Sequence, residues 1–222
     1  MRPLVRLSLT ALLATTMTLG VVSTASAADA PKTQLMNQSD LTPFGGVKSG
    51  SWAIVPLDTT LPNAICTGAN GQEIEFPKAK GWEVNGQIKT TKRYADVTEI
   101  VRDYGTQESS AQAWQALNAA ADQCPAKARD VMIPGSKKSY YNVTQTQPEV
   151  AGAVTMMTRT IAVSPDKRIN GGSTAAYSVY RQAGNAIVEV IYYSNPGVTV
   201  KAGTRNEVNK LSQELSARWP SS

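Results

Sequence analysis

The residue types that could do chemistry are few in this chain. The sequence contains no histidine and only two cysteines. It therefore lacks an imidazole general base, every catalytic arrangement that depends on one, and histidine ligands for a metal ion. Two cysteines cannot supply a four-cysteine zinc site or hold an iron–sulfur cluster. The sequence accordingly predicts no catalytic residue, no cofactor site and no metal site.

Two kinds of histidine-free hydrolysis remain open. Paired carboxylates hydrolyse glycosides, and a Ser–Lys dyad can supply a nucleophile and its base. The candidate acids are Glu73 and Glu75, then Asp96, Glu99 and Asp103; the candidate dyad lies in Ser136-Lys137-Lys138-Ser139. The dyad follows Pro134-Gly135, which is typical of a loop. In both cases the pattern favours solvated surface groups over a catalytic pair.

Four tryptophans could instead form an aromatic platform for a ligand: Trp52, Trp82, Trp114 and Trp219. Trp114 and Trp219 fall on the apolar stripes of expected helices, which favours core packing. Core packing is also favoured for Trp52 and Trp82, with the platform as the alternative. Because loops carry recognition more often than strands do, the loop around Cys66 and the Gly45-Gly46 turn are the expected rims of a cleft.

Residues 1–27 have the pattern of a secretory signal peptide. Arg2 and Arg6 precede an uncharged, mostly apolar stretch, and Ala25-Ser26-Ala27 is a small-x-small cleavage site. We expect cleavage between Ala27 and Ala28; an uncleaved anchor is the less favoured alternative. No later run approaches the roughly 18 apolar residues of a membrane-spanning helix, so none is expected in the mature chain.

The exported compartment is oxidising, and the two cysteines, Cys66 and Cys124, both lie in the mature chain. They are therefore expected to form one disulfide. Two free thiols, one of them a nucleophile, are the alternative, but no activating partner is evident. The formal net charge is +5, and the lysines and arginines do not form the dense patch of a nucleic-acid binder, so no nucleic-acid partner is expected.

The elements that would position these residues follow from periodicity. Apolar residues at three- and four-residue steps predict helices over Gln107–Gln123, capped by Thr106, and from Thr204, with Glu207 completing a capping box. A short helix is expected over Leu35–Phe44. Strands are expected over Ser51–Val55, Ala95–Tyr104, Ser139–Gln147, Ala153–Val163, Ala175–Ala183 and Ala186–Ser194. Asn85-Gly86 predicts a hairpin turn within Gly81–Thr91, and Pro62–Gly71 is expected to be a loop.

These elements predict an α+β fold, a twisted, mostly antiparallel sheet with two main helices packed on it and one disulfide. Residues 28–34 are expected to be a disordered tail, and residues 35–222 a single domain. Ala186–Tyr193 is nearly continuously apolar, which is typical of a central strand.

The order of motifs resembles a known family. A short Asp40–Gly45 segment precedes a cysteine in Pro62–Cys66, and a strand ends in Val101–Tyr104. A helix then runs from Ala113-Trp114 to Cys124-Pro125, and Arg181–Asn185 leads into Val188–Val190 before the closing helix. This looks like the PknH-like extracellular sensor-domain family of actinobacteria. The resemblance covers about Leu35 to Trp219.

The resemblance implies a secreted, non-enzymatic sensor or ligand-binding domain of the cell envelope with a presumed binding cleft. Its partner would be a small molecule or a cell-envelope component, and signalling would require a separate membrane protein, because this chain carries no kinase domain. Kinase-linked members are understood to have two disulfides, and only the Cys66–Cys124 pair carries over. A small secreted hydrolase that uses carboxylates or a Ser–Lys pair is the alternative function.

Overall fold

The strand predicted to be central, β10 (Ala186–Tyr193), lies between β5 (Tyr94–Asp103) and β9 (Thr174–Ala183), antiparallel to both. Its first six residues are all buried, which explains the continuous apolar sequence. The computed structural model describes residues 33–57, 63–67, 73–76, 79–89, 94–124, 131–132, 139–146, 150–163, 174–194 and 198–219. The expected signal peptide, the Ala27–Ala28 junction and most of the 28–34 tail lie outside these residues.

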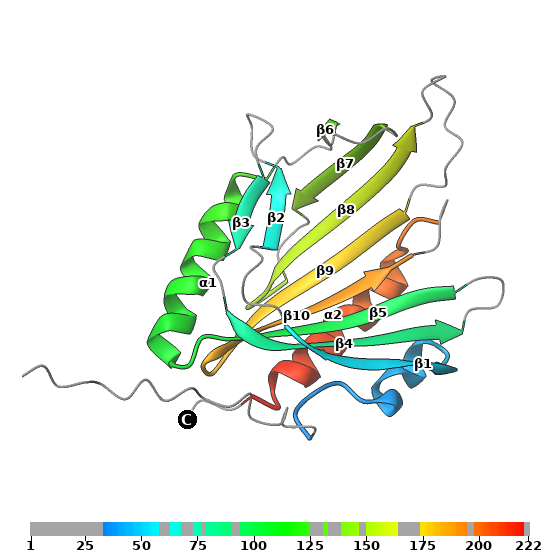
Figure 1. Cartoon of the computed structure of the whole chain (residues 1–222), viewed down its shortest axis with the longest axis horizontal. Helices are drawn as coiled ribbons and strands as arrows, with labels where there is room; N and C mark the ends of the chain where they lie inside the picture. Colours follow the sequence, from blue (N-terminus) through cyan, green and yellow to red (C-terminus); the bar gives the residue numbers. More distant parts are fainter. Residues whose placement is uncertain are drawn as a thin grey trace, which may run out of the picture.

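Eight described strands form one twisted antiparallel sheet in the order β1-β4-β5-β10-β9-β8-β7-β6 (Figure 1). The remaining members are β1 (Val47–Pro56), β4 (Lys80–Lys89), β8 (Val154–Val163), β7 (Ser139–Thr146) and β6 (Val131–Met132). A separate antiparallel pair consists of β2 (Asn63–Thr67) and β3 (Glu73–Phe76). The helices are η1 (Gln38–Phe44, a 3-10 helix), α1 (Gln107–Asp122) and α2 (Ala202–Ser216).

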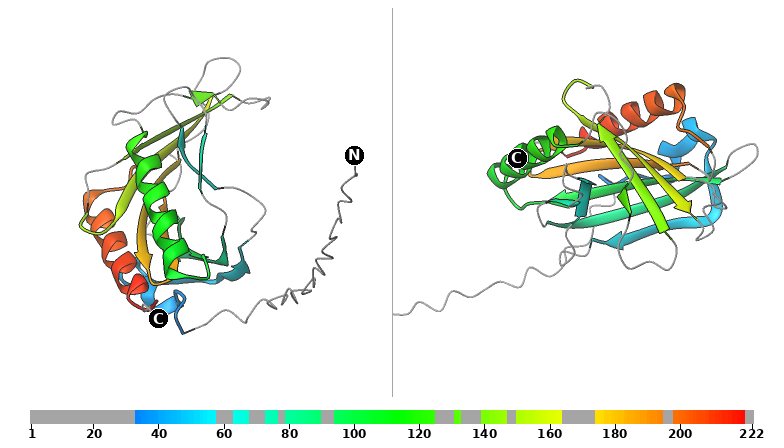
Figure 2. Two further views of the ribbon diagram at one scale, coloured as in Figure 1. Left: turned by 90° about the vertical axis from the view of Figure 1, so that its left-hand side faces the viewer. Right: turned by 90° about the horizontal axis from the view of Figure 1, so that it is seen from above.

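The two α-helices lie on opposite sides of the large sheet (Figure 2). We call these sides the α1 face and the α2 face. On the α2 face, α2 and η1 cover the main core, to which Val84, Val97, Val101, Val188 and Val190 contribute. On the α1 face, a smaller core joins the helix stripe of Ala113, Leu117 and Ala120 to Met156, Tyr180 and Ile187. Because strand side chains alternate, each strand supplies residues to both sides.

The sequence expectations for α1, β5, β8, β9 and β10 are confirmed within one residue at either end. Thr106 caps α1 as predicted, its hydroxyl accepting a hydrogen bond from the Ser109 backbone N–H at 3.1 Å. The buried positions Val208, Leu211, Leu215 and Trp219 follow the predicted stripe. Local periodicity therefore gives these elements correctly.

Three local predictions are wrong. Asn85-Gly86 is not a turn, because Lys80–Lys89 is one uninterrupted strand paired along its length with β5. The segment around Cys66 is not a loop, because Asn63–Thr67 pairs with β3. The last helix begins three residues earlier than the predicted capping box requires: Lys201 occupies the N-cap, without a side-chain cap, and Thr204 lies inside the first turn.

The predicted fold class also needs correction. The α+β class, the antiparallel sheet, the two main helices and the short opening helix hold, but the described chain also has a second small sheet. The predicted Cys66–Cys124 disulfide is not part of the described fold: Cys124 is the only cysteine whose side chain is described, and no cysteine pair is seen among the described side chains. Cys124 itself is buried just after the end of α1.

Candidate functional site

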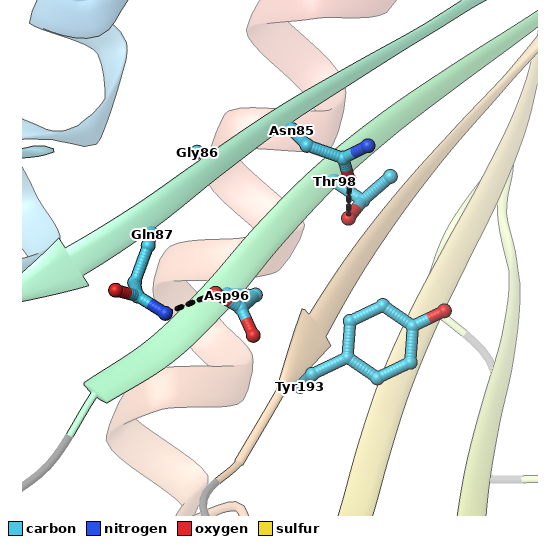
Figure 3. A pocket seen from close by; sticks show the side chains of 6 residues that line it. All are labelled: Asn85, Gly86, Gln87, Asp96, Thr98 and Tyr193. Atoms are coloured by element: carbon cyan, nitrogen blue, oxygen red, sulfur yellow. Dashed lines mark hydrogen bonds between the residues drawn. The ribbon is translucent and has the colours of Figure 1, made fainter. Parts of the chain in front are cut away.

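Most of the α2 face is covered, but part of the α1 face is open. The α1 helix packs across one end of that face, where the Ser110 hydroxyl donates to the Ala186 carbonyl at 3.3 Å. At the other end, strands β4, β5 and β10 surround a hollow of about 330 Å³. The hollow is lined by Asn85, Gly86, Gln87, Asp96, Thr98 and Tyr193 (Figure 3). These residues come from three neighbouring strands; the side chains of all but Gly86 lie on the side of the sheet away from α2, and Gly86 contributes backbone.

Hydrogen bonds between its lining residues hold much of the hollow in place. The Thr98 hydroxyl donates to Asn85 Oδ1 at 2.6 Å, and Asn85 Nδ2 donates to Glu83 Oε1 at 2.7 Å. Gln87 Nε2 donates to Asp96 Oδ1 at 3.3 Å. Strand pairing explains these contacts, because Asn85 lies opposite Thr98 and Gln87 lies opposite Asp96. A ligand would therefore meet polar groups that are already oriented.

Tyr193 supplies an aromatic ring at the edge of this array. It is 38% exposed. Partial burial of the ring raises the pKa of Tyr193 to about 12, and the negative charges of Glu189, Glu83 and Asp96 add to this rise. The positive charge of Arg102 opposes it. The phenol is therefore protonated at neutral pH and can donate a hydrogen bond. The hollow thus combines amides, a carboxylate, hydroxyls and one aromatic ring.

A buried ion pair lies further along the same face, towards α1. Arg102 Nη1 is 2.7 Å from Glu189 Oε2, and both side chains are almost completely buried. Burial opposes the charge on Arg102, but the neighbouring Glu189 carboxylate raises the pKa of the guanidinium above its usual value. Burial raises the pKa of Tyr180, which shares a hydrogen bond with Glu189. Arg102 therefore stays charged and Tyr180 stays protonated at neutral pH.

The acids that sequence analysis singled out do not converge. Asp96 is exposed at the hollow, whereas Glu99 points to the opposite face and is completely buried. The Asp103 carboxylate accepts from the Gly105 backbone N–H at 2.7 Å and from Asn185 Nδ2 at 2.9 Å, which ties together the two turns at that end of the sheet. No group of three or more metal-ligating side chains occurs among the residues described.

The other sequence candidates divide between the core and the undescribed residues. Trp82 and Trp219 stack with their ring centroids 6.1 Å apart, and Trp52 and Trp82 pack against the main core, so neither of these two forms a separate platform. Gly45 caps η1, and the Gly45-Gly46 turn borders that helix rather than the hollow. The side chains of Cys66, Glu73, Glu75 and Ser139 and the whole of 136–138 lie outside the described residues.

Sequence analysis missed most of the hollow. Asn85 and Gly86 were interpreted as a turn, and Gln87, Thr98 and Tyr193 carried no recognisable motif. One signal was available: polar residues at every second position of Gly81–Thr91, from Glu83 onwards. That alternation could have indicated that one sheet face is open to solvent.

No protein-family model and no curated protein matches this chain. Among solved structures, the chain is similar to the extracellular domain of PknH from Mycobacterium tuberculosis, with 14% identity, a TM-score of 0.49, and 84% of this chain and 94% of that chain covered. That is the kind of domain to which the sequence resemblance pointed. A likeness at this level carries no assignment of ligand or partner. Within the described residues, no helix is long and apolar enough to cross a membrane.

Proposed function

We propose that this chain is a non-enzymatic binding domain that acts outside the cell, and that its ligand occupies the hollow on the α1 face. The observation that carries the proposal is the fixed polar array of Asn85, Thr98, Gln87 and Asp96 beside the Tyr193 ring. Ligand sites combine a concave surface with a few oriented polar groups. A small molecule or a piece of the cell envelope is the expected occupant.

The composition of the chain supports binding over catalysis. The sequence has no histidine. Asp96 and Glu99, two candidate acids on β5, project from opposite faces of that strand and cannot flank one scissile bond. Tyr193 is held protonated, which suits a hydrogen-bond donor and not a base. The hydrolase alternative gains no supporting observation from these residues.

Native mass spectrometry of protein secreted by its own host provides the test. Wild-type protein should carry a bound mass that disappears in Asn85→Ala and Tyr193→Ala. Lys210→Ala is the matched control, because Lys210 is exposed on α2, on the other side of the sheet, and pairs with the neighbouring Glu207. It should keep the bound mass.

Two results would contradict the proposal. One is a bound mass that survives both hollow variants, which would place the ligand elsewhere. The other is turnover of a glycoside, ester or peptide substrate that is lost in Asp96→Ala, which would make the protein a hydrolase. Circular dichroism of each variant should first establish that it is folded.

A further inference from the structure

The start of the described chain, residues 33–46, crosses the α2 face as a strap. Leu35, Met36 and Leu41 are completely buried there, within the main core. The strap is not a strand of the large sheet, so ladder hydrogen bonds do not hold it. Apart from apolar packing, two polar contacts attach it to other described residues.

The first contact joins the strap to β5. The Met36 backbone N–H donates to Glu99 Oε2 at 2.6 Å, across 63 residues of sequence. The second contact joins the strap to the turn after α2. Arg218 donates to both Asp40 oxygens, at 2.6 and 2.9 Å, and to the Leu35 carbonyl at 3.2 Å. The strap therefore links β5 to the C-terminal end of the fold.

Glu99 occupies an unusual place for a carboxyl group. Its strand partners on either side are Val84 and Val190. No hydrogen-bond partner for its second oxygen, Oε1, is found among the described residues. The charged groups that face it are Asp40 of the strap and Arg218 after α2, which form an ion pair with each other. Glu214 of α2 is exposed, and its charge helps to raise the pKa of Arg218.

This environment favours the neutral acid. Burial raises the pKa of Glu99 to about 7, and Asp40 adds to the rise, whereas the Met36 N–H and the charge of Arg218 oppose it. An ionised carboxylate that is buried with one donor needs water on its other oxygen. The strap lies outside the sheet ladder, and its Met36 N–H contacts the carboxyl directly, so opening of the strap would admit that water.

We propose that the strap is a pH-dependent clasp, which is seated on the sheet while Glu99 is protonated and is released when Glu99 ionises. Release frees Met36 and exposes Leu35 and Leu41, while the sheet stays folded. The Asp40–Arg218 pair is a second attachment, and it does not change over the same pH range because the pKa of Asp40 is lowered. Burial alone would raise that pKa, but hydrogen bonds from Arg218 and Asn37 outweigh the effect of burial.

Hydrogen exchange of the full mature protein tests the clasp. Protection factors of the backbone amides in residues 35–46, corrected for intrinsic exchange, should fall about tenfold for each pH unit between about 4.5 and about 7 and level off at higher pH. Amides of β10 should stay unchanged. In Glu99→Gln, the strap amides should show the same protection at pH 6 and pH 8.5. Asp40→Asn is the matched control: it should lower strap protection at both pH values and keep the slope.

An unchanged pH slope in Glu99→Gln would overturn the proposal. A second measurement keeps the proposal testable if that variant does not fold. The carboxyl ¹³C resonance of Glu99 in wild-type protein should titrate near neutral pH, together with strap resonances. Titration of Glu99 below pH 5, or strap resonances that do not follow it, would also overturn the proposal. Neither measurement depends on whether the hollow on the α1 face binds a ligand.

Discussion

Gly86 has no β-carbon, and the side chains of the buried Leu41 and the partly buried Trp52 fill the space that this leaves. An ideal β-carbon there would lie 2.7 Å from Leu41 Cδ1 and 3.0 Å from the Trp52 ring. Leu41 is completely buried and cannot turn away. The glycine therefore serves a close approach between η1 and β4 and not a turn, which is a recognised role of glycine within a strand.

Replacing Gly86 with alanine should therefore be costly. We expect Gly86→Ala to lower the free energy of unfolding by about 1–3 kcal/mol, the usual cost of overpacking. Gly203→Ala is the control, because a β-carbon at Gly203 in α2 meets no atom within 4 Å. It should raise stability by about 0.5 kcal/mol through helix propensity. Urea denaturation measures both, and equal effects would contradict the packing argument.

The Arg102–Glu189 pair gives a second prediction at the residue scale. Glu189→Gln leaves a buried guanidinium without its counter-charge, so unfolding free energy should fall by about 3–5 kcal/mol. The double variant Arg102→Met, Glu189→Leu should recover most of the loss, because it removes both charges from the interior. Chemical denaturation of Arg102→Met, Glu189→Leu and the double variant completes a double-mutant cycle, and additive losses would show that the two residues act separately.

At the scale of elements, α2 begins without a side-chain cap. Lys201 occupies the N-cap, in an extended conformation, and its side chain accepts no hydrogen bond from a first-turn N–H. Lys201→Asp should stabilise the protein by about 1 kcal/mol, since aspartate can accept from a first-turn N–H and complements the helix dipole. Thr204→Ala should lose no cap, although the sequence pattern placed the cap there. Thermal denaturation distinguishes a helix that begins after Lys201 from one that begins after Thr204. If Thr204→Ala lowered the free energy of unfolding by about 1 kcal/mol or more, Thr204 would be the N-cap, as the sequence pattern predicted.

Local patterns predicted most elements but not the contacts between them. The stripe of α1 and the apolar run of β10 identify themselves, because each is fixed by its own sequence period. The role of Gly86 depends on its contact with Leu41, which lies 45 residues earlier in the chain, so no local sequence pattern could predict that role. The same holds for the hollow, which exists only once β4, β5 and β10 are placed in register.

At the scale of the whole molecule, Glu99 should make stability depend on pH. Its folded pKa is raised from 4.5 to about 7, so between these values the folded protein binds more protons than the unfolded chain. The contribution of Glu99 is thus fully present below about pH 4.5 and is lost as pH rises through about 7. The loss is about 3 kcal/mol.

Denaturation of wild-type protein and Glu99→Gln between pH 4 and 8.5 provides the measurement. The difference between the two proteins isolates Glu99 from every other titrating group. The stability of wild-type protein relative to the variant should fall with rising pH and level off above neutrality. A difference that rises with pH would mean that the carboxylate, and not the neutral acid, is the form that the core prefers.

The contact between Arg218 and Leu35 has a topological consequence. Residues separated by 183 positions are joined by a 3.2 Å hydrogen bond, so the described chain nearly closes on itself. A short flexible linker could make that closure covalent, and the chain could then be opened elsewhere, as in other domains whose ends lie close together. Gly105 is exposed between β5 and α1 and is a suitable place for new ends. Such a circular permutant would keep the order of strands in space while reversing which elements are made first, and the strap would then follow α2 directly in the chain.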